Sequence, residues 1–316
     1  MLRTESDIRK DWHNSDGIMV SICCICYNQK DYIRKCLDGI FMQVTNFPYE
    51  ILLHDDASTD GTTDIIKEYE KKYPTILKPL YEEENQWEKG LRGSFVFNLP
   101  RSKGKYIAFC EGDDYWTDPL KLQKQVDFLE GHEDVRVCFH RVNVIVPNER
   151  KMLEDYHVID VPGESSIIDL AKIGNYIPTN SAMYRNDNQV YADVSKVGST
   201  PIGDYTLWMM CAQYGKIYKL PDNMAVYRYG VGSWQSKPKI CQYINILNLL
   251  NRLRMVLHDV QAIKVLDDRI NDMTSQIIDM ERKDKEQLKM IKGSRTYRLG
   301  NFIAKPMNFV RKIFKG

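Results

Sequence analysis

Residues 50–62 of the chain read EILLHDDASTDGT, a short apolar run followed by a polar stretch rich in turn-forming residues. Residues 50–54 (EILLH) predict a strand buried on both faces, because the strands of a covered parallel sheet are nearly continuous apolar runs. The residues after the turn continue into a helical pattern over 62–73. We therefore expect a strand, a turn and a helix in succession at this point of the chain.

The same order of elements is repeated on either side. Residues 20–26 (VSICCIC) and 105–110 (KYIAFC) predict two more buried strands, and 135–146 predict a further one. Helical patterns cover residues 31–43 and 119–130, the latter with Asp118 as its cap. Residues 74–104 are less regular, and only 91–99 are compatible with a helix. This alternation predicts an α/β fold, in which helices flank a mostly parallel sheet with right-handed crossovers.

The C-terminal part has a different pattern. From Ile240 to Met280, apolar residues recur every three or four positions, which is typical of one long helix or of two with a break near Val260. We expect three parts: an α/β domain over 1–238, a helical extension over 239–292 and a tail over 293–316. The long helix could pack on the α/β domain or on a second copy in a homodimer, and its periodicity leaves both open.

Composition narrows the class of protein. Hydrophobic residues make up 43% of the 316 residues and charged residues 28%, an ordinary globular balance that excludes a disordered chain. No apolar run reaches the roughly 18 residues that a transmembrane helix needs, and residues 1–17 lack the apolar region of a secretory signal. Eight cysteines without such a signal indicate reduced thiols. We therefore expect a cytoplasmic protein.

The charge is unevenly distributed. No acidic residue follows Glu286, whereas eight lysine and arginine residues do. Aromatic and aliphatic residues lie between these cations in the tail, as in helices that bind an anionic membrane surface. The alternative is a basic helix packed on its own acidic body. A nucleic-acid partner is not expected, because the body lacks a basic groove. We expect peripheral association with the inner face of the cell membrane.

Carboxylates follow two of the predicted strands. Asp55 and Asp56 end the strand over 50–54, and ligands of open α/β sheets bind at the carboxyl ends of strands. A carboxylate there can hold a ribose hydroxyl or a base edge. Alternatively, Asp55 and Asp60 only form a turn and cap the next helix.

Residues 111–114 (EGDD) follow the strand over 105–110. Their three carboxylates repel one another unless a cation is present, and carboxylate oxygens suit Mg²⁺ or Mn²⁺. Such an ion could bind the oxygens of a diphosphate and carry the charge that grows as the diphosphate leaves. The alternative is an exposed acidic turn. Because an apolar strand precedes this stretch and a capped helix follows it, we favour a metal site.

Taken in this order, the motifs over residues 20–146 resemble the inverting glycosyltransferases of family 2, which have the GT-A fold. Residues 55–62 (DDASTDGT) resemble the family's second-strand motif. Residues 111–114 resemble its acidic metal-binding motif, with Glu in place of the commoner Asp at the first position. The run from residue 111 to 125 (EGDDYWTDPLKLQKQ) is similar to the branch that builds capsule and lipopolysaccharide glycans in bacteria.

The resemblance implies a substrate and a role for each residue. The donor would be a nucleotide sugar, a UDP-sugar above all, and the acceptor a hydroxyl of a glycan or a lipid-linked glycan. Tyr27 and Asp56 would contact the uracil or ribose, and Asp113 the ribose or sugar. Asp114 would be the direct ligand of Mn²⁺ or Mg²⁺, with Glu111 as a weaker contributor.

The family also places a carboxylate on the acceptor side, and Asp204 in the stretch IGDYTLW (202–208) fits that place. An inverting transfer needs a base to take the proton of the attacking hydroxyl. Alternatively, Asp204 only caps the helix that begins near Tyr205; both uses can coexist. The family often carries a His in the segment corresponding to residues 227–234, where this chain has Tyr229. Arg228 in that segment could still close over the diphosphate.

Other features are less specific. Residues 178–181 (PTNS) could bind sugar hydroxyls, and Trp116 and Trp234 could stack on sugar rings or pack in the core. Residues 23–26 (CCIC) are expected to be core rather than a metal site, because neighbours on a strand point to opposite faces and no second Cys or His pair with matching spacing follows.

Two other functions remain as alternatives. One is a sugar nucleotidyltransferase of similar fold, which the loop after the first strand disfavours because that loop lacks a glycine-rich stretch with Arg and Lys. The other is a non-catalytic scaffold docked on the membrane.

Overall fold

The structure is a computed structural model that describes residues 2–13, 17–91, 93–146, 151–154, 161–231 and 237–293. Its strands form one mixed sheet in the order β3-β2-β1-β4-β9-β6-β10-β5, with β7 beside β6 and β8 beside β10. The strands are β1 (Val20–Cys26), β2 (Tyr49–Asp55), β3 (Leu77–Tyr81), β4 (Tyr106–Phe109), β5 (Tyr115–Trp116), β6 (Val135–Val146), β7 (Lys151–Glu154), β8 (Glu164–Ser165), β9 (Met183–Arg185) and β10 (Lys216–Arg228).

The first four strands in chain order are parallel, and the sequence predicts three of them, β1, β2 and β4. β1 and β2 pair from Val20 opposite Tyr49 to Cys26 opposite Asp55, so both strands end at the same level. Every residue of β2 is buried, because helices cover both faces of the sheet. The turns after β1 and β2, which carry predicted site residues, therefore begin side by side at the carboxyl ends of these strands.

The irregular stretch differs in detail from the prediction. β3 was not predicted, because Lys78 and Pro79 interrupt its apolar pattern. It lies at one end of the strand order, and proline is tolerated in edge strands because its missing N–H is not needed there. The helix expected over 91–99 is a π-helical turn (Ser94–Asn98) followed by a 3₁₀ turn (Leu99–Arg101). π-helical turns are frequent at functional sites.

In the second half of the sheet the strand directions alternate. β9 runs antiparallel to both β4 and β6, while β10 is parallel to β6. The strand over 135–146 is confirmed. The helix predicted from Pro119 begins at Lys121 instead. The carboxylate of Asp118 accepts a hydrogen bond from the main-chain amide of Leu120, which closes a turn before the helix rather than its first turn.

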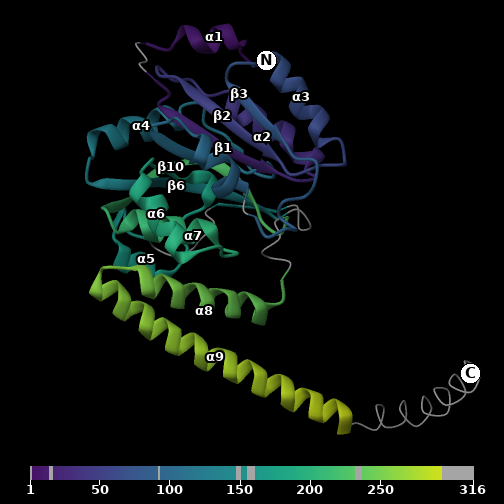
Figure 1. Ribbon diagram of the computed structural model, residues 1–316, viewed down its shortest axis with the longest axis vertical. Coiled ribbons are helices and arrows are strands. Elements are labelled where there is room, and N and C mark those ends of the chain that lie inside the picture. Colours follow the sequence, from purple (N-terminus) through teal and green to yellow (C-terminus); the bar gives the residue numbers. More distant parts are fainter. Residues whose placement is uncertain are drawn as a thin grey trace, which may run out of the picture.

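Helices cover the sheet on two sides, with a hydrophobic core on each (Figure 1). α2, α3 and α4 lie on one face, and α5 to α9 lie on the other, where they bury a cluster around Trp208. Cys24 belongs to the first core and Cys23 to the second, which confirms that these cysteines are packing residues. The helices are α1 (Glu5–Lys10), α2 (Lys30–Phe41), α3 (Thr62–Lys72), α4 (Lys121–Gly131), α5 (Ile167–Ile173), α6 (Asn188–Val197), α7 (Gly203–Ala212), α8 (Lys239–Val256) and α9 (Val260–Gly293).

α8 and α9 form the helical C-terminal region, and the break between them lies where the periodicity permits one, before Val260. Leu250 and Leu253 of α8 and Leu266 of α9 are fully buried in the core around Trp208. The remainder of α9 extends away from the body (Figure 1). The division into 1–238, 239–292 and 293–316 stays a prediction.

The tail lies outside the described residues, apart from Gly293 at its start. In the part of the chain that the structure describes, no helix combines the length and the apolarity needed to cross a bilayer.

Candidate active site

The loops after β1 and β2 are joined to each other. The main-chain amide of Asn28 donates to the hydroxyl of Ser58 over 2.9 Å, and the amide of Thr59 donates to the side-chain oxygen of Asn28 over 2.8 Å. Asn28 and Ala57 both have positive φ, 50° and 62°. Backbone conformations of this kind are rare outside glycine and cluster at functional sites. The two loops thus form one hydrogen-bonded rim at the ends of the strands.

Asp56 and Tyr27 lie on this rim. Asp56 is 7% exposed, and its carboxylate accepts hydrogen bonds from the main-chain amides of Gln86 at 2.6 Å and Trp87 at 3.1 Å. Asp56 therefore also anchors a loop that follows β3, a contact that the sequence did not indicate. Tyr27 is 45% exposed. Its role and that of Asp56 in nucleotide binding remain predictions.

Asp55 and Asp60 have the structural roles that were considered for them. Asp55 accepts a hydrogen bond from the main-chain amide of Ser58 over 3.2 Å. Asp60 accepts from the amide of Thr62 over 2.9 Å and from the amide of Lys30 over 3.0 Å. These bonds shape the turn and secure the first turns of α3 and α2.

The acidic turn follows β4 and packs against the loop after β1. A Cβ atom at Gly112 would lie 2.2 Å from the side-chain oxygen of Gln29 and 2.8 Å from Cβ of Cys26. Both approaches are closer than van der Waals contact permits, so only glycine fits. Gly112 thus allows the acidic turn to pack closely on the first strand.

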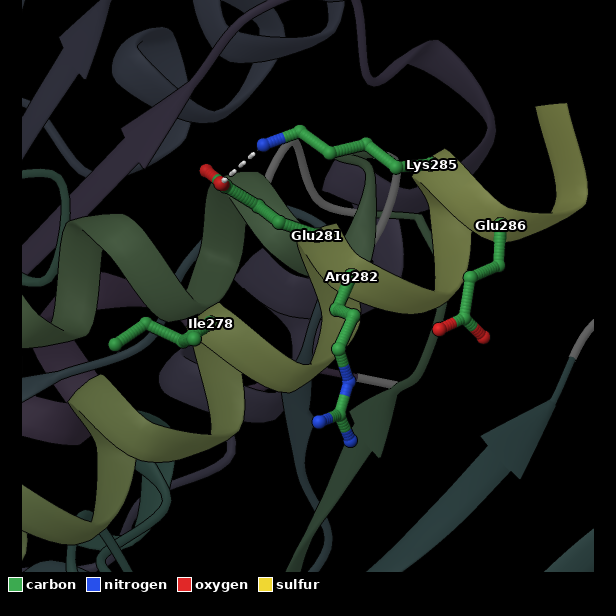
Figure 2. A pocket seen from close by; sticks show the side chains of 5 residues that line it. All are labelled: Ile278, Glu281, Arg282, Lys285 and Glu286. Atoms are coloured by element: carbon green, nitrogen blue, oxygen red, sulfur yellow. Dashed lines mark ion pairs between the residues drawn. The ribbon is translucent and has the colours of Figure 1, made fainter. Parts of the chain in front are cut away.

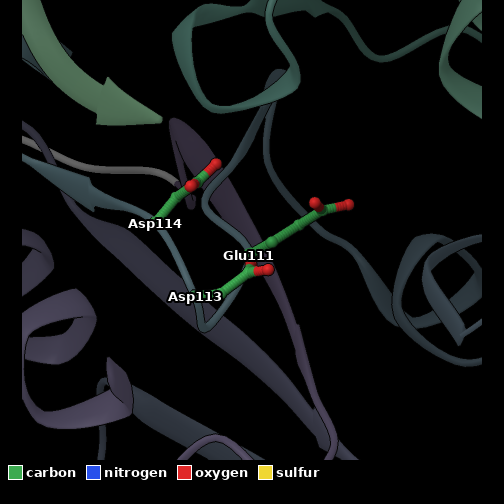
Figure 3. Close-up of side chains that lie close together, drawn as sticks. All are labelled: Glu111, Asp113 and Asp114. Carbon is green, nitrogen blue, oxygen red and sulfur yellow. The ribbon is translucent and has the colours of Figure 1, made fainter. Parts of the chain in front are cut away.

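The side chains of Glu111, Asp113 and Asp114 lie close together in this turn (Figure 3). Each offers one carboxylate oxygen, and these oxygens all lie within 4.8 Å of one another. Burial raises the pKa of Asp113, and burial together with the charge of Asp113 holds the pKa of Asp114 well above its usual range. Burial, Asp113 and Asp204 raise the pKa of Glu111 to about 8. Burial therefore disfavours the ionised forms of all three carboxylates, and a cation in the turn would favour them.

The end of β10 supports the acidic turn. The main-chain amide of Arg228 donates to Oδ1 of Asp114 over 2.8 Å, and its guanidinium donates to the carbonyl oxygen of Asp113. The guanidinium carbon lies 4.8 Å from the ring centres of both Tyr32 and Tyr115. Arg228 is buried, and these contacts hold the acidic turn in place.

A cavity of about 510 Å³ adjoins the acidic turn, and it is lined by both Glu111 and Asp204. Ligand pockets in proteins typically have volumes of about 300–1,000 Å³. The cavity wall includes Trp87, from the loop that Asp56 anchors, and Phe95, from the π-helical turn. Two carboxylates that are far apart in the sequence thus face one ligand-sized space.

Asp204 lies at the start of α7, and three groups donate to its carboxylate. Oδ1 accepts from the main-chain amide of Tyr205 over 2.8 Å, whereas Oδ2 accepts from the side chains of Asn175 over 2.7 Å and Thr179 over 3.3 Å. Burial raises the pKa of Asp204, and these three donors oppose the rise. Asp204 thus accepts a hydrogen bond within the first turn of α7 and also lines the cavity. Asn175 was not predicted, since a lone Asn in a loop carries no pattern.

Trp116 is a core residue. Its indole N–H donates to the carbonyl oxygen of Asn180 over 2.8 Å, and the ammonium group of Lys121 lies 4.1 Å from its ring centre. Among residues 178–181, Pro178 and Thr179 line the cavity, while Asn180 is buried and bonds to β10. Trp234 lies outside the described residues.

A smaller hollow of about 320 Å³ lies on α9 (Figure 2). Its lining residues are Ile278, Glu281, Arg282, Lys285 and Glu286. They all belong to one helix, and the ion pair between Glu281 and Lys285 runs along its surface at 3.7 Å. A single helix does not enclose a ligand, so this hollow is a solvated helix face.

Comparison with known proteins gives a family match. The family model described as glycosyl transferase family 2 matches residues 21–191, more than half of the chain. An uncharacterized protein of Mycobacterium tuberculosis is 43% identical over 218 residues, which cover 69% of this chain and 61% of that protein. The chain therefore spans about three fifths of the length of that relative.

Shorter matches link the chain to named glycosyltransferases. The putative teichuronic acid biosynthesis glycosyltransferase TuaG of Bacillus subtilis is 37% identical over 111 residues, 35% of this chain and 42% of that protein. The Escherichia coli enzyme WfaP, named UDP-Glc:α-D-GlcNAc-diphosphoundecaprenol β-1,3-glucosyltransferase, is 37% identical over 112 residues, 35% of this chain and 41% of that protein.

Solved structures share the fold. Staphylococcus aureus TarS, residues 1–349 with UDP-GlcNAc, superimposes with a TM-score of 0.59 at 19% identity, covering 81% of this chain and 72% of that chain. The mannosyltransferase PcManGT of Pyrobaculum calidifontis, with GDP-Man and Mn²⁺, gives a TM-score of 0.56 at 14% identity, covering 94% and 89%. These similarities confirm the predicted GT-A fold.

Proposed function

Because the chain belongs to glycosyl transferase family 2, we propose that it is a metal-dependent inverting glycosyltransferase. It transfers a sugar from a UDP-sugar to a hydroxyl of a glycan or a lipid-linked glycan in the synthesis of a surface polysaccharide. One observation carries the proposal: Glu111 of the acidic turn and Asp204 of α7 line the same cavity. A donor held at the first would meet an acceptor activated by the second.

The acidic turn fits a divalent cation. Three carboxylate oxygens within 4.8 Å are hard donors, and burial raises the pKa of all three groups, so a cation bound there would favour their ionised forms. Asp114 would hold Mn²⁺ or Mg²⁺, with Glu111 contributing, and Asp113 would bind the ribose or sugar. The cation would supply positive charge to the diphosphate as it leaves.

Asp204 would act as the base. Its ionised carboxylate would accept the proton of the acceptor hydroxyl while the hydroxyl oxygen bonds to C1 of the sugar. The bond from C1 to the diphosphate oxygen breaks at the same time, so the configuration at C1 inverts and the nucleoside diphosphate leaves. Hydrogen bonds from Asn175, Thr179 and the amide of Tyr205 orient the carboxylate.

The relatives support the proposed substrates. The name of WfaP specifies a UDP-sugar donor and an acceptor on diphosphoundecaprenol, and TarS was solved with UDP-GlcNAc. On this basis a UDP-sugar and a lipid-linked glycan are the proposed substrates. An acceptor in the membrane suits the proposed role of the basic tail, residues 293–316, which would bind the anionic inner face of the cell membrane.

A comparison of wild type with Asp204→Asn tests the proposal. The amide keeps the shape of the side chain but cannot take a proton, so transfer should fall by a factor of about 10²–10⁴. Binding of UDP with Mn²⁺, followed by calorimetry, should be unchanged. If the variant transfers sugar as fast as the wild type, Asp204 is not the base. If neither protein transfers sugar or binds a nucleotide, a scaffold is favoured over an enzyme.

A further inference from the structure

We infer that Arg269 of α9 is a positioning residue for Asp204, so that the C-terminal helical region is a working part of the active site. The inference rests on the proposed role of Asp204 as the base. Arg269 lines the cavity of about 510 Å³ together with Asp204, although it comes from a helix beyond the family match at residues 21–191. The long helix, for which the sequence left open packing on the α/β domain or on a second copy, thus contributes a residue to the cavity wall.

On one side Arg269 contacts the residue after Asp204. Its Nη1 group donates to the hydroxyl of Tyr205 over 3.1 Å, and that hydroxyl donates to the carbonyl oxygen of Leu170 over 3.0 Å. Tyr205 is buried, and its main-chain amide holds Oδ1 of Asp204. Arg269 therefore fixes the tyrosine whose amide orients one oxygen of the base.

On the other side Arg269 holds the end of α5. Nη1 also donates to the carbonyl oxygen of Ala171, in the last turn of that helix. Gly174 follows with φ of +101°, and a Cβ atom there would lie 3.1 Å from Nη2 of Arg269. A guanidinium at a helix C-terminus satisfies carbonyls that lack helical partners and interacts favourably with the helix dipole.

Gly174 leads directly into the residues that hold the second oxygen of Asp204. Asn175 and Thr179 both donate to Oδ2, and both lie in the segment that begins at Gly174. One guanidinium therefore supports the donors to both carboxylate oxygens. A displacement of about 1 Å at a reacting group can cost a factor of about 10² in rate, so loss of this support should reach the chemical step.

The burial of α9 is consistent with this role. Leu266 and Ala262, on the same helix, are fully buried in the core around Trp208, which fixes the start of α9 on the body. Ile246 of α8 also lines the cavity. Both helices of the C-terminal region thus contribute to the wall beside Asp204.

The first test is independent of catalysis. Hydrogen exchange is compared between wild type, Arg269→Ala and the control Arg282→Ala, whose side chain is 67% exposed further along α9. We expect exchange over residues 170–179 to rise by about tenfold in Arg269→Ala alone, because the last turn of α5 loses its support. Exchange over β1 and β2 should not change. Unaltered exchange over residues 170–179 would overturn the inference whether or not the protein is a glycosyltransferase.

The second test uses turnover of the full chain with a UDP-sugar and Mn²⁺. Arg269→Ala should lower kcat by about tenfold or more while the KM for the donor is unchanged, since the guanidinium does not contact the acidic turn. Arg269→Lys should recover part of the loss, and Arg282→Ala should match the wild type. An equal loss of donor affinity and of kcat would indicate general damage and contradict positioning.

A double variant distinguishes positioning from a separate effect. Because Arg269 acts in part through Asn175, the variant with both Arg269→Ala and Asn175→Ala should lose less kcat than the product of the two single losses. Losses that multiply fully would show that Arg269 and Asn175 act independently and would overturn the inference. Asp204→Asn is measured alongside: if it retains full activity, the proposed function fails, while the exchange result still decides whether Arg269 holds residues 170–179.

Discussion

The main-chain amide of Arg228, at the end of β10, donates a hydrogen bond over 2.8 Å to the carboxylate of Asp114, directly before β5. The two residues meet because β5 and β10 pair antiparallel, with Tyr115 opposite Val226. The orientation of the proposed metal ligand is thus set by the register of the sheet. A side chain fixed in this way is preorganised for a ligand.

Replacement of Asp114 by Asn should weaken metal binding without changing the shape of the turn. The neutral amide removes one negative charge from the three-carboxylate group, so affinity for Mn²⁺ in the presence of UDP should fall by at least about tenfold. Electron paramagnetic resonance of free Mn²⁺ measures this. Asp127→Asn, at an exposed position of α4, is the control. Equal affinity in the Asp114 variant and the wild type would show that the ion binds elsewhere.

Removal of the amide donor from Asp204 should change the pH dependence of transfer. Burial raises the pKa of Asp204, and the bond from Asn175 favours the ionised form and opposes that rise. In Asn175→Ala the pKa should rise further, so the acidic limb of the rate profile should move to higher pH. Asp204 can accept a proton only when it is ionised, so a higher pKa moves the acidic limb to higher pH. Asn251→Ala on α8 should keep the wild-type profile; a limb that moves to lower pH in Asn175→Ala would contradict the account.

The buried side chain of Lys121, which lies against the ring of Trp116, should make stability depend on pH. Burial lowers the pKa of Lys121 from its ordinary 10.5 to about 7. Between these values the unfolded chain binds a proton that the native protein does not, so native stability rises with pH through this window, by at most about 1.4 kcal/mol per pH unit. Below pH 7 both states are protonated, and this gain is absent.

Urea unfolding at pH 7 and pH 9 tests whether the stability of the native protein rises with pH. The wild type should gain stability relative to Lys121→Met when the pH is raised, because the methionine does not titrate. Lys71→Met, at an exposed position of α3, should track the wild type at both values. A difference between the wild type and Lys121→Met that is the same at pH 7 and pH 9 would mean that Lys121 titrates normally.

Gly112→Ala should destabilise the protein through overpacking. The added Cβ atom would meet the side-chain oxygen of Gln29 at 2.2 Å and Cβ of Cys26 at 2.8 Å, and forced repacking of this kind costs about 1–3 kcal/mol. Gln29→Ala in the same chain should recover part of the loss. Gly131→Ala is the matched control, since no atom lies within 4 Å of its Cβ position. Thermal unfolding of the wild type, Gly112→Ala, the double variant and Gly131→Ala measures the effect. If Gly112→Ala is as stable as the wild type, the acidic turn does not pack on Gln29 and Cys26 as described.

The parallel half of the sheet could be predicted from the sequence, because β1, β2 and β4 are nearly continuous apolar runs. Such runs indicate strands that are buried on both faces. β3 was missed because Pro79 is compatible only with an edge, and edges are set by neighbours rather than by the strand itself. α4 begins at Lys121 because Asp118 bonds the amide of Leu120 and completes a turn first.

The candidate site was predictable only where short-range patterns carry it. The carboxylates of residues 111–114 are adjacent in the chain, so their proximity follows from the sequence. That Asp204 shares a cavity with Glu111 depends on long-range packing, as do the contacts of Asn175 and Arg269. Arg269 lies beside the apolar stripe of α9, between Leu266 and Ile270, and that position is the signal that could have indicated a contact with the body.

Nucleotide binding and release from a panel of UDP-, GDP-, dTDP- and CMP-sugars, with Mn²⁺ and with EDTA, tests the central claim most directly. We predict binding and release from a UDP-sugar with Mn²⁺, loss of both with EDTA, and loss of release in Asp114→Ala. Absence of binding and release for every donor in the presence of Mn²⁺ would contradict the proposed function.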